Sequence, residues 1–265
     1  MFNKTTKIEY SEHGEIAARQ KKLLSWINPQ ELTGLEIGPF DRPIVDRKMG
    51  QVKYLDFFSE SEIREKYAHT PERVMENIVS LDYVIKSGKF RDVINERFDY
   101  IVASHVIEHV PNMLGWLRSL EEILNPSGRV FLVVPDRRFT FDIDRPATSL
   151  GEIIENDYLN RERPSPRSAF DQYYYHRQVR AHDAWVNPDM AKQVVKTHTM
   201  EQNLSFFERS KTEYIDCHCN VFSGDEFVEI VDQTRALNLH GLSIEQVGYT
   251  EKYTLEFYSL LRRGG

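Results

Sequence analysis

Apolar and polar residues alternate in blocks typical of strands and helices through the first half of the chain. Short apolar runs at residues 35–37, 52–55, 77–84, 98–104 and 129–134 predict buried strands. Between the last two runs, apolar residues recur at helical spacing over residues 113–124, and the sequence NPSG that follows is a helix stop. Strand, helix and strand in this order predict a βαβ unit in a parallel sheet.

The pattern changes in the second half of the chain. Residues 136–220 are polar, aromatic and rich in Arg and His. Unstructured loops of this length are uncommon in compact domains, so we expect a largely helical insertion. A capping box at Ser223 then begins a helix, and strands at residues 243–249 and 254–262 predict a terminal hairpin. A further helix is predicted at residues 8–27, before Asn28-Pro29, and another at residues 59–66.

Composition narrows the class of protein. The chain has 265 residues, of which 40% are hydrophobic and 28% charged, which suits one globular α/β domain. Its apolar runs are too short to span a bilayer, and residues 1–15 lack an apolar signal core, so a cytoplasmic protein is expected. The net charge of −7 argues against nucleic acid as a partner. Cys217 and Cys219 are too close for a normal disulfide, which fits reducing surroundings.

Residues 34–56 have the outline of a nucleoside-binding unit. The first strand stops at Gly38, where backbone and ligand can approach closely, and the second stops at Asp56, whose carboxylate can accept both ribose hydroxyls. A pyrophosphate would need a glycine-rich turn with free N–H groups. Here Pro39 and Phe40 follow the glycine, and Asp41 would repel phosphate. The pattern favours S-adenosylmethionine (SAM) and disfavours the alternative, a nicotinamide dehydrogenase.

Several motifs resemble those of class I SAM-dependent methyltransferases of the type 11 group. They are LEIGPFDRP, SLDYV, FDYIVASHVIEHVPN and LNPSGRVFLVVPD, in this order. The resemblance implies a Rossmann-like, seven-stranded, mostly parallel sheet with an antiparallel last strand, SAM as cofactor and S-adenosylhomocysteine as product. The segments RPI, RPSPRSAFD and DCHCNVFSGDEF resemble, more weakly, a bacterial group that modifies sugars or surface polysaccharides.

The pattern along the chain, together with this resemblance, predicts a single methyltransferase domain over residues 1–265. Residues 1–33 would be an N-terminal helical segment and residues 34–135 the SAM-binding core. Residues 136–220 would be an inserted substrate cap, and residues 221–265 a terminal helix and hairpin.

The resemblance assigns cofactor contacts as well. It places Glu36 and Gly38 beside the methionine part of SAM, Asp56 on the ribose and Asp82 on the adenine amino group. Leu81 or Tyr83 would pack on the adenine ring, and Ser104 and His105 would border the methionine part and the methyl group.

The turn after Gly38 departs from the family pattern, because the second and third glycines are absent. Asp41 and Arg42 are candidates to pair with the zwitterionic end of SAM. The full set of cofactor-binding candidates is Glu36, Ile37, Gly38, Pro39, Asp41, Arg42, Asp56, Leu81, Asp82, Tyr83, Ser104 and His105.

Methyl transfer to an alcohol requires a base or a metal, whereas an amine acceptor needs only to be neutral. His105, Glu108 and His109 follow the central strand, and their spacing allows them to converge on one helical face. The alternative is that Glu108 and His109 brace the start of the helix. Asp136 and His218 complete the catalytic candidates.

Cys217 and Cys219 would share one face of a strand and His218 the other, without partners for a four-ligand zinc site. No residue is therefore assigned as a metal ligand, although a divalent ion acting with Asp136 or His109 is left open.

The insertion supplies candidate acceptor contacts. Its Arg residues beside Tyr173-Tyr174-Tyr175 could clamp the phosphates of a nucleotide sugar, and the alternative is a solvated helical face. The candidates in and beside the insertion are Arg137, Arg138, His176, Arg177, His182 and His198. The acceptor is expected to be a small molecule or glycan, methylated on a sugar hydroxyl. Methylation of an amine, a regulatory SAM-binding protein without turnover, and a homodimer remain alternatives.

Overall fold

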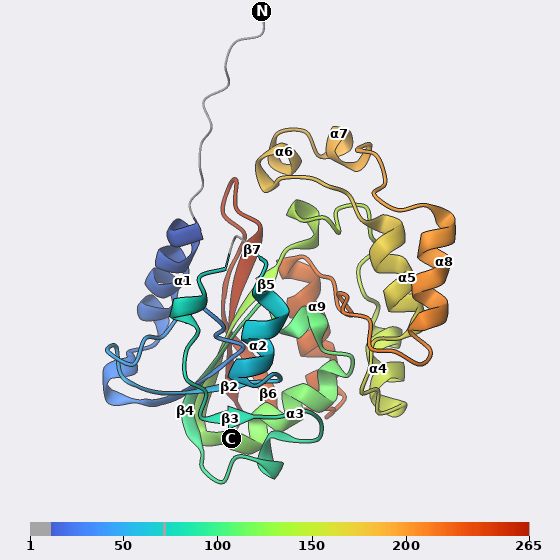
Figure 1. Ribbon diagram of the computed structural model, residues 1–265. Coiled ribbons are helices and arrows are strands. Elements are labelled where there is room, and N and C mark those ends of the chain that lie inside the picture. The colour runs from blue at the N-terminus through green and yellow to red at the C-terminus, as the bar shows by residue number, and fades with distance from the viewer. Residues whose placement is uncertain (1–11, 71–72, 265) are drawn as a thin grey trace, which may run out of the picture.

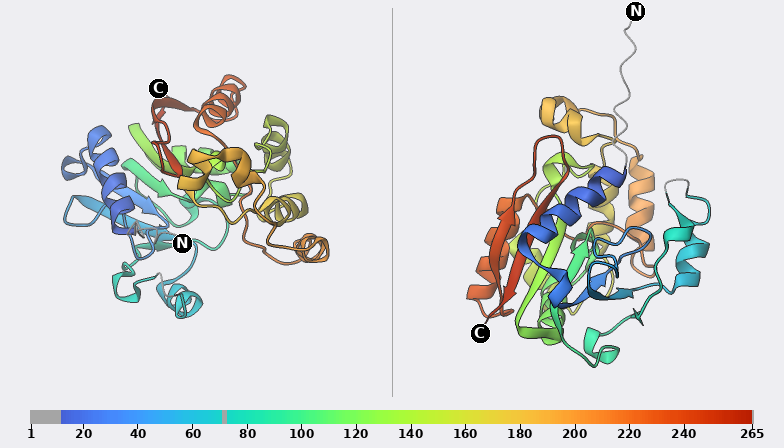
Figure 2. Two further views of the ribbon diagram at one scale, coloured as in Figure 1. Left: turned by 90° about the horizontal axis from the view of Figure 1, so that it is seen from above. Right: turned by 90° about the vertical axis from the view of Figure 1, so that its left-hand side faces the viewer.

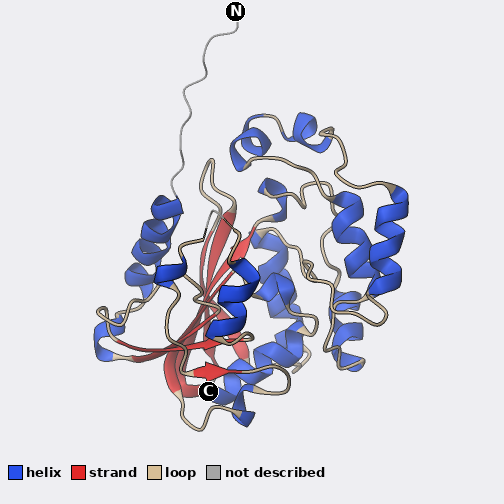
Figure 3. Cartoon of the chain, viewed as in Figure 1, coloured by secondary structure: helices blue, strands red, loops and turns tan. Residues whose placement is uncertain are grey.

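A seven-stranded sheet forms the centre of the computed structural model, which describes residues 12–70 and 73–264 (Figure 1). The strand order is β3-β2-β1-β4-β5-β7-β6. Neighbours from β3 to β5 pair in parallel, and β7 is antiparallel to both β5 and β6. The strands are β1 (Thr33–Ile37), β2 (Gln51–Asp56), β3 (Tyr83–Val84), β4 (Phe98–Ser104), β5 (Leu124–Pro135), β6 (Leu242–Gly248) and β7 (Glu256–Arg263). The expected Rossmann-like fold with an antiparallel end is confirmed (Figure 3).

Alternating side chains of the strands build a core on each face of the sheet. On β4, Ile101 and Ala103 join the cluster that contains α3 (Met113–Ile123) and α9 (Gly224–Ala236). Tyr100 and Val102 join the opposite cluster, which includes Leu23 of α1 (Glu12–Trp26). Figure 2 shows α1 lying across its own face of the sheet. The sheet is therefore buried on both sides, as parallel strands require.

Most predicted element boundaries agree with the structure. The helix expected at residues 8–27 is α1, and residues 8–11 lie outside the described residues. The helix α2 (Glu60–Tyr67) begins with a capping box at Ser59, and α9 begins with the predicted one at Ser223. The terminal hairpin is β6 and β7.

The strand predicted at residues 77–84 is wrong over most of its length. Only Tyr83 and Val84 pair with β2. The preceding backbone bonds to other parts of the chain, because Val79 N–H donates to Phe40 O at 3.2 Å and Leu81 N–H donates to Glu60 Oε1 at 3.0 Å. Most of the apolar run at residues 77–84 therefore lies outside the strand and covers the edge of the sheet.

The strand β5 begins earlier than the sequence predicts. The sequence NPSG ends α3, but its residues belong to the first part of β5. The pairing with β4 shifts register here, because Phe98 pairs with Leu124 and Tyr100 pairs with Arg129. The extra residues of β5 form a β-bulge, a conformation that the turn-forming sequence NPSG can adopt.

The insertion is mainly helical, as expected. It contains α4 (Leu150–Tyr158), α5 (Pro166–Tyr175), α6 (Ala181–Val186), α7 (Pro188–Lys192) and α8 (Met200–Arg209). In Figure 1, α5 and α8 lie side by side, and Tyr173 stacks on Phe206 with ring centroids 3.7 Å apart. On α6, Trp185 Nε1 donates to Thr254 O at 2.9 Å, in the turn of the hairpin.

Residues 213–221 form an irregular segment between α8 and α9. The strand assumed around Cys217 and Cys219 is therefore wrong, although both thiols are buried in one apolar cluster. Across the described ranges, no helix combines the length and apolar character needed to cross a membrane.

Gly34→Ala is expected to destabilise the fold by about 1–3 kcal/mol. A Cβ at Gly34 would lie 2.0 Å from Cζ of Tyr100, which is fully buried and cannot move aside freely. Denaturant unfolding measures the change. Gly151→Ala is the matched control, because its Cβ would meet nothing nearer than Ser149 Oγ at 3.9 Å. Equal stability of the two variants would contradict the packing argument.

Candidate active site

Three candidate residues meet where neighbouring parallel strands end. The register pairs Ile37 of β1 with Leu55 of β2 and with Ala103 of β4. Gly38, Asp56 and Ser104 therefore lie together at the carboxyl edge of the sheet. The order β2-β1-β4 reverses direction at this point, which is where open α/β sheets bind their ligands.

The turn after β1 has an unusual backbone. Gly38 has φ +68°, and a Cβ there would lie 3.2 Å from Val106 Cγ2. Phe40 and His105 also have positive φ values, 51° and 53°. L-residues rarely adopt this conformation, and such residues concentrate at functional sites. The predicted close approach at Gly38 is consistent with this geometry, whereas the strain at His105 had no signal in the sequence.

Glu36 shapes the loop that follows the turn. Its carboxylate is buried and accepts from the N–H groups of Ile44 at 2.7 Å and Val45 at 2.9 Å. Burial raises the pKa of Glu36 to about 7, in spite of these hydrogen bonds. Since both oxygens are in use, Glu36 supports the cofactor edge through the loop backbone.

Asp41 and Arg42 do not present a pair of free charges at this edge. Asp41 has no exposed side-chain surface and accepts from Arg73 Nη1 at 3.1 Å and Val74 N–H at 2.9 Å. Arg42 Nε lies 3.6 Å from Asp41 Oδ2. The expectation that Asp41 meets the zwitterionic end of SAM is corrected, because its carboxylate is enclosed by the chain itself.

Asp56 is the last residue of β2, and one of its carboxylate oxygens accepts a hydrogen bond from the chain itself. Its Oδ1 accepts from Phe58 N–H at 3.1 Å, and burial raises the pKa of the carboxyl above its usual range. Asp82 uses Oδ2 to accept from Arg47 Nη2 at 2.7 Å and Tyr54 N–H at 2.8 Å. Both carboxylates retain acceptor positions for a nucleoside.

Leu81 and Tyr83 pack against opposite faces of the sheet, so only one of them can border an adenine ring. The Tyr83 hydroxyl donates to Glu96 and accepts from Lys53 Nζ at 3.3 Å. These bonds hold Tyr83 on the outer part of β3.

His105 lies between two buried carboxylates. Its Nε2 is 2.8 Å from Glu256 Oε2, and its Nδ1 is 3.4 Å from Glu108 Oε1. Burial opposes the charged imidazole, but these two partners outweigh it and raise the pKa of His105 to about 9. Burial would also raise the pKa of Glu256, yet hydrogen bonds from His105 and Arg19 lower it to about 2. Both carboxylates therefore favour the charged form of the His105 imidazole.

Glu108, His109 and His218 converge beside this pair. One ligand atom of each lies within 4.8 Å of the others. His109 Nδ1 is 2.9 Å from Asp216 Oδ1, and His218 Nδ1 is 2.6 Å from Asp142 Oδ2. Burial opposes the charged form of His109, while Asp216 raises its pKa. Both histidines were candidates from the sequence, but nothing in the sequence indicated that they lie close together.

Asp136 has a structural role in this arrangement, and its assignment as a catalytic residue is corrected. Its side chain is fully covered. It accepts from Arg138 Nε at 2.9 Å and Nη2 at 2.7 Å, and from Thr250 Oγ1 at 2.7 Å. A carboxylate with these partners and no exposed surface cannot reach an acceptor.

The expected phosphate clamp of arginines is not formed by Arg137, Arg138 and Arg177. Arg137 pairs with Glu226 at 2.6 Å, and Arg138 pairs with Asp136. Arg177 is buried and forms an ion pair with Asp144. All three guanidinium groups serve contacts within the chain.

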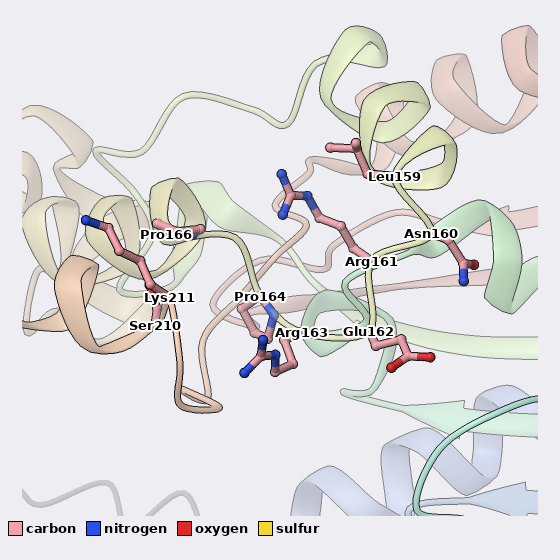
Figure 4. A pocket seen from close by; sticks show the side chains of 9 residues that line it. All are labelled: Leu159, Asn160, Arg161, Glu162, Arg163, Pro164, Pro166, Ser210 and Lys211. Atoms are coloured by element: carbon pink, nitrogen blue, oxygen red, sulfur yellow. The ribbon is translucent and has the colours of Figure 1, made fainter.

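A pocket of about 550 Å³ lies elsewhere in the insertion (Figure 4). Arg161, Arg163 and Lys211 give it a basic lining, with Glu162 as its acidic member. No candidate cofactor or catalytic residue lines it. This pocket and the candidate active site are therefore distinct.

Four residues of the site were not predicted from the sequence. They are Arg19, Asp142, Asp216 and Glu256. Glu256 and His105 are 151 positions apart, so no local pattern links them. Of these four residues, Asp216 was the one that the sequence could have indicated, because it adjoins the Cys-His-Cys segment that resembles part of a zinc site.

Comparison with known proteins places this geometry in a family. Residues 13–234 match a family model described as a methyltransferase domain. Comparison with curated proteins gives no match.

Solved structures give a similar fold at low identity. A putative zinc-dependent alcohol dehydrogenase from Rhodobacter sphaeroides has 15% identity and a TM-score of 0.51, over 94% of this chain and 90% of that one. At this identity the likeness shows the fold alone. A putative SAM-dependent methyltransferase from Listeria monocytogenes has 12% identity and a TM-score of 0.47, over 94% of this chain and 100% of that one. DhpI in complex with S-adenosylhomocysteine has 15% identity and a TM-score of 0.46, over 98% of this chain and 88% of that one.

The fold and its carboxyl edge define a nucleoside-binding α/β protein. Because the family match spans most of the chain, the chain belongs to the methyltransferase domain family. It is a SAM-dependent methyltransferase, with SAM as the methyl donor and S-adenosylhomocysteine as the product. The dehydrogenase alternative and the regulatory protein without turnover are thereby set aside.

Glu36→Gln is expected to remove a pH dependence of stability. Between pH 4.5 and about 7 the folded state keeps the Glu36 proton that the unfolded chain has released. The stability of the wild type therefore falls as pH rises through this window, by about 3 kcal/mol at most, and levels off above it. Denaturant unfolding across the window compares wild type with Glu36→Gln and with Glu65→Gln, an exposed control. A constant difference between wild type and Glu36→Gln would contradict the assigned pKa.

Proposed function

We propose that the enzyme methylates a hydroxyl group of a sugar, carried by a nucleotide sugar or at the end of a glycan. The main support for this proposal is the pair of histidines, His109 and His218, which lie beside Glu108. The Nδ1 atom of each histidine contacts an aspartate carboxylate. The proposed acceptor enters over the carboxyl edge of the sheet, on the side where the irregular segment after α8 covers it.

The proposed cofactor residues are those that fit a nucleoside at this edge. Gly38 offers the close backbone approach, and Asp56 offers acceptor positions to the ribose hydroxyls. Asp82 retains Oδ1 for the adenine amino group. Ser104 Oγ is buried and has no hydrogen-bond partner within the described residues, which suits a polar ligand group beside it. When bound, SAM supplies an electrophilic methyl group on a sulfonium.

A hydroxyl acceptor accounts for the histidines better than an amine does. In methyl transfer to a hydroxyl, oxygen bonds to the methyl carbon, the C–S bond breaks with its electron pair on sulfur, and the hydroxyl proton must leave. A neutral amine needs no activation before it attacks. Two histidines oriented through Nδ1, with Nε2 available, provide activation that an amine would not require. They support O-methylation over N-methylation.

An aromatic rim supports a sugar as the acceptor. Phe40 and Tyr67 lie edge to face on the cofactor side, with ring centroids 4.6 Å apart. On the insertion side, Tyr214 is half-exposed. Aromatic walls with a few polar groups are typical of sites for small ring-shaped ligands.

Asp56→Ala is expected to weaken binding of S-adenosylhomocysteine by about 10- to 150-fold. The change removes charge-assisted hydrogen bonds of about 1.5–3 kcal/mol. Calorimetric titration measures the affinity, with Asp232→Ala on the exposed face of α9 as control. Unchanged affinity in Asp56→Ala would overturn the ribose assignment. Binding of NAD in place of S-adenosylhomocysteine would overturn the cofactor site as a whole.

His109→Ala is expected to lower turnover of a sugar acceptor by about 10²- to 10⁴-fold while leaving the affinity for S-adenosylhomocysteine close to that of wild type. The loss arises because the acceptor hydroxyl is no longer activated. Transfer from labelled SAM to nucleotide sugars, with amino sugars assayed in parallel, gives the turnover. The exposed His69→Ala is the control.

Two results would contradict this proposal. Transfer to amines alone would replace the hydroxyl by a nitrogen acceptor. Equal losses of stability and activity in His109→Ala would show that His109 braces the fold and does not act on the acceptor.

A further inference from the structure

The triad of Glu108, His109 and His218 has an arrangement that the methyltransferase family match does not explain. Glu108 and His109 belong to the 3-10 helix η4 (Ile107–His109), directly after β4, and His218 comes from the irregular segment after α8. Backbone hydrogen bonds hold the two segments together, because Cys219 N–H donates to Glu108 O at 2.5 Å and Asn220 N–H at 3.1 Å. The position of His218 relative to Glu108 is therefore fixed by the backbone.

Each histidine is oriented by a carboxylate on its far side. Asp216 holds Nδ1 of His109 at 2.9 Å, and Asp142 holds Nδ1 of His218 at 2.6 Å. The rings meet edge to face with centroids 4.9 Å apart. Among the described residues, Nε2 of neither ring forms a hydrogen bond, so both nitrogens can bind another ligand. A histidine that binds a metal typically has this carboxylate on its other nitrogen.

The surroundings of Glu108 give a second observation that points to a bound metal ion. Its side chain is 1% exposed, and neither carboxylate oxygen has a hydrogen-bond partner within the described residues. The nearest imidazole nitrogens lie farther from Oε1, His105 Nδ1 at 3.4 Å and His109 Nε2 at 4.0 Å. A buried carboxylate normally accepts several hydrogen bonds or binds a metal. Here both oxygens lack such bonds while two imidazole nitrogens lie beside them.

We propose that Glu108, His109 and His218 form a binding site for one divalent transition-metal cation. Two imidazoles and one carboxylate with open positions suit ions such as Zn²⁺ and Mn²⁺, whereas Mg²⁺ prefers a site made of oxygen ligands. Ligand atoms that share an ion at about 2.1 Å lie at most about 4.2 Å apart. The three ligand atoms lie within 4.8 Å of one another, so they would have to approach by about half an ångström to share an ion.

This site deepens the proposed function, on which its role in activity rests. A cation held by Glu108, His109 and His218 would lie beside the carboxyl edge of the sheet and could also bind an acceptor hydroxyl. Binding to a cation makes a hydroxyl easier to deprotonate at neutral pH. The hydroxyl proton would then pass to solvent water.

Metal titration of the full chain tests the proposal without any acceptor. The protein is freed of metal with a chelator and titrated by calorimetry with Mn²⁺ and with Zn²⁺, and Co²⁺ absorption reports the ligands. We expect one ion per chain. Glu108→Gln and His218→Ala should weaken binding by at least about 10-fold, and Asp142→Asn, which only orients His218, by about 10- to 100-fold. Thermal unfolding and S-adenosylhomocysteine affinity of each variant show that it is folded.

Control variants separate this site from other metal ligands. The exposed His69→Ala and the buried-thiol variant Cys217→Ser should bind the ions as wild type does. Absence of stoichiometric binding, wild-type affinity in the triad variants, or loss of binding only in Cys217→Ser would each overturn the site. If Glu108→Gln does not fold, His218→Ala and Asp142→Asn decide the outcome. Because no acceptor is present, the result is independent of whether a sugar is methylated.

Discussion

The ion pair between His105 and Glu256 is the interaction on which the carboxyl edge of the sheet depends. It connects the end of β4 with the start of β7, and Arg19 of α1 joins it through two bonds to Glu256, at 2.9 and 2.6 Å. Buried charges are tolerated only when each has a partner in good geometry. The three elements are therefore fixed relative to one another, and the strained backbone of His105 is the conformation that this fit requires.

The insertion is tied to the same point. Beside the bonds to Glu108 O, Asn220 Nδ2 donates to Ile107 O at 2.9 Å and to Val110 O at 2.7 Å. These bonds satisfy carbonyl groups in and directly after η4 and anchor the end of the insertion next to β4. The end of the insertion is thus held against the carboxyl edge of the sheet both by backbone hydrogen bonds and by the Asn220 side chain.

The carboxylates at this edge differ in the partners that they bind. Glu36 organises the loop after β1 by accepting two N–H groups, and the Tyr54 hydroxyl donates to Val45 O at 2.7 Å in the same loop. Asp142 and Asp216 instead contact the imidazoles of His218 and His109. These carboxylates look alike in a sequence, and only the folded structure shows which partner each one has.

The sequence by itself determined the alternating strands and helices, the capping boxes at Ser59 and Ser223, and the nucleoside-binding outline from Gly38 to Asp56. These features follow from periodicity and from contacts between near neighbours in the chain, which a sequence contains in full. Only the tertiary structure decided that Asp41 and Asp136 turn into the protein, and that His218 meets Glu108. Those outcomes depend on which distant groups the fold brings within bonding distance. A buried charged side chain must pair with whichever groups lie next to it in the folded protein, and the sequence does not show which groups these are.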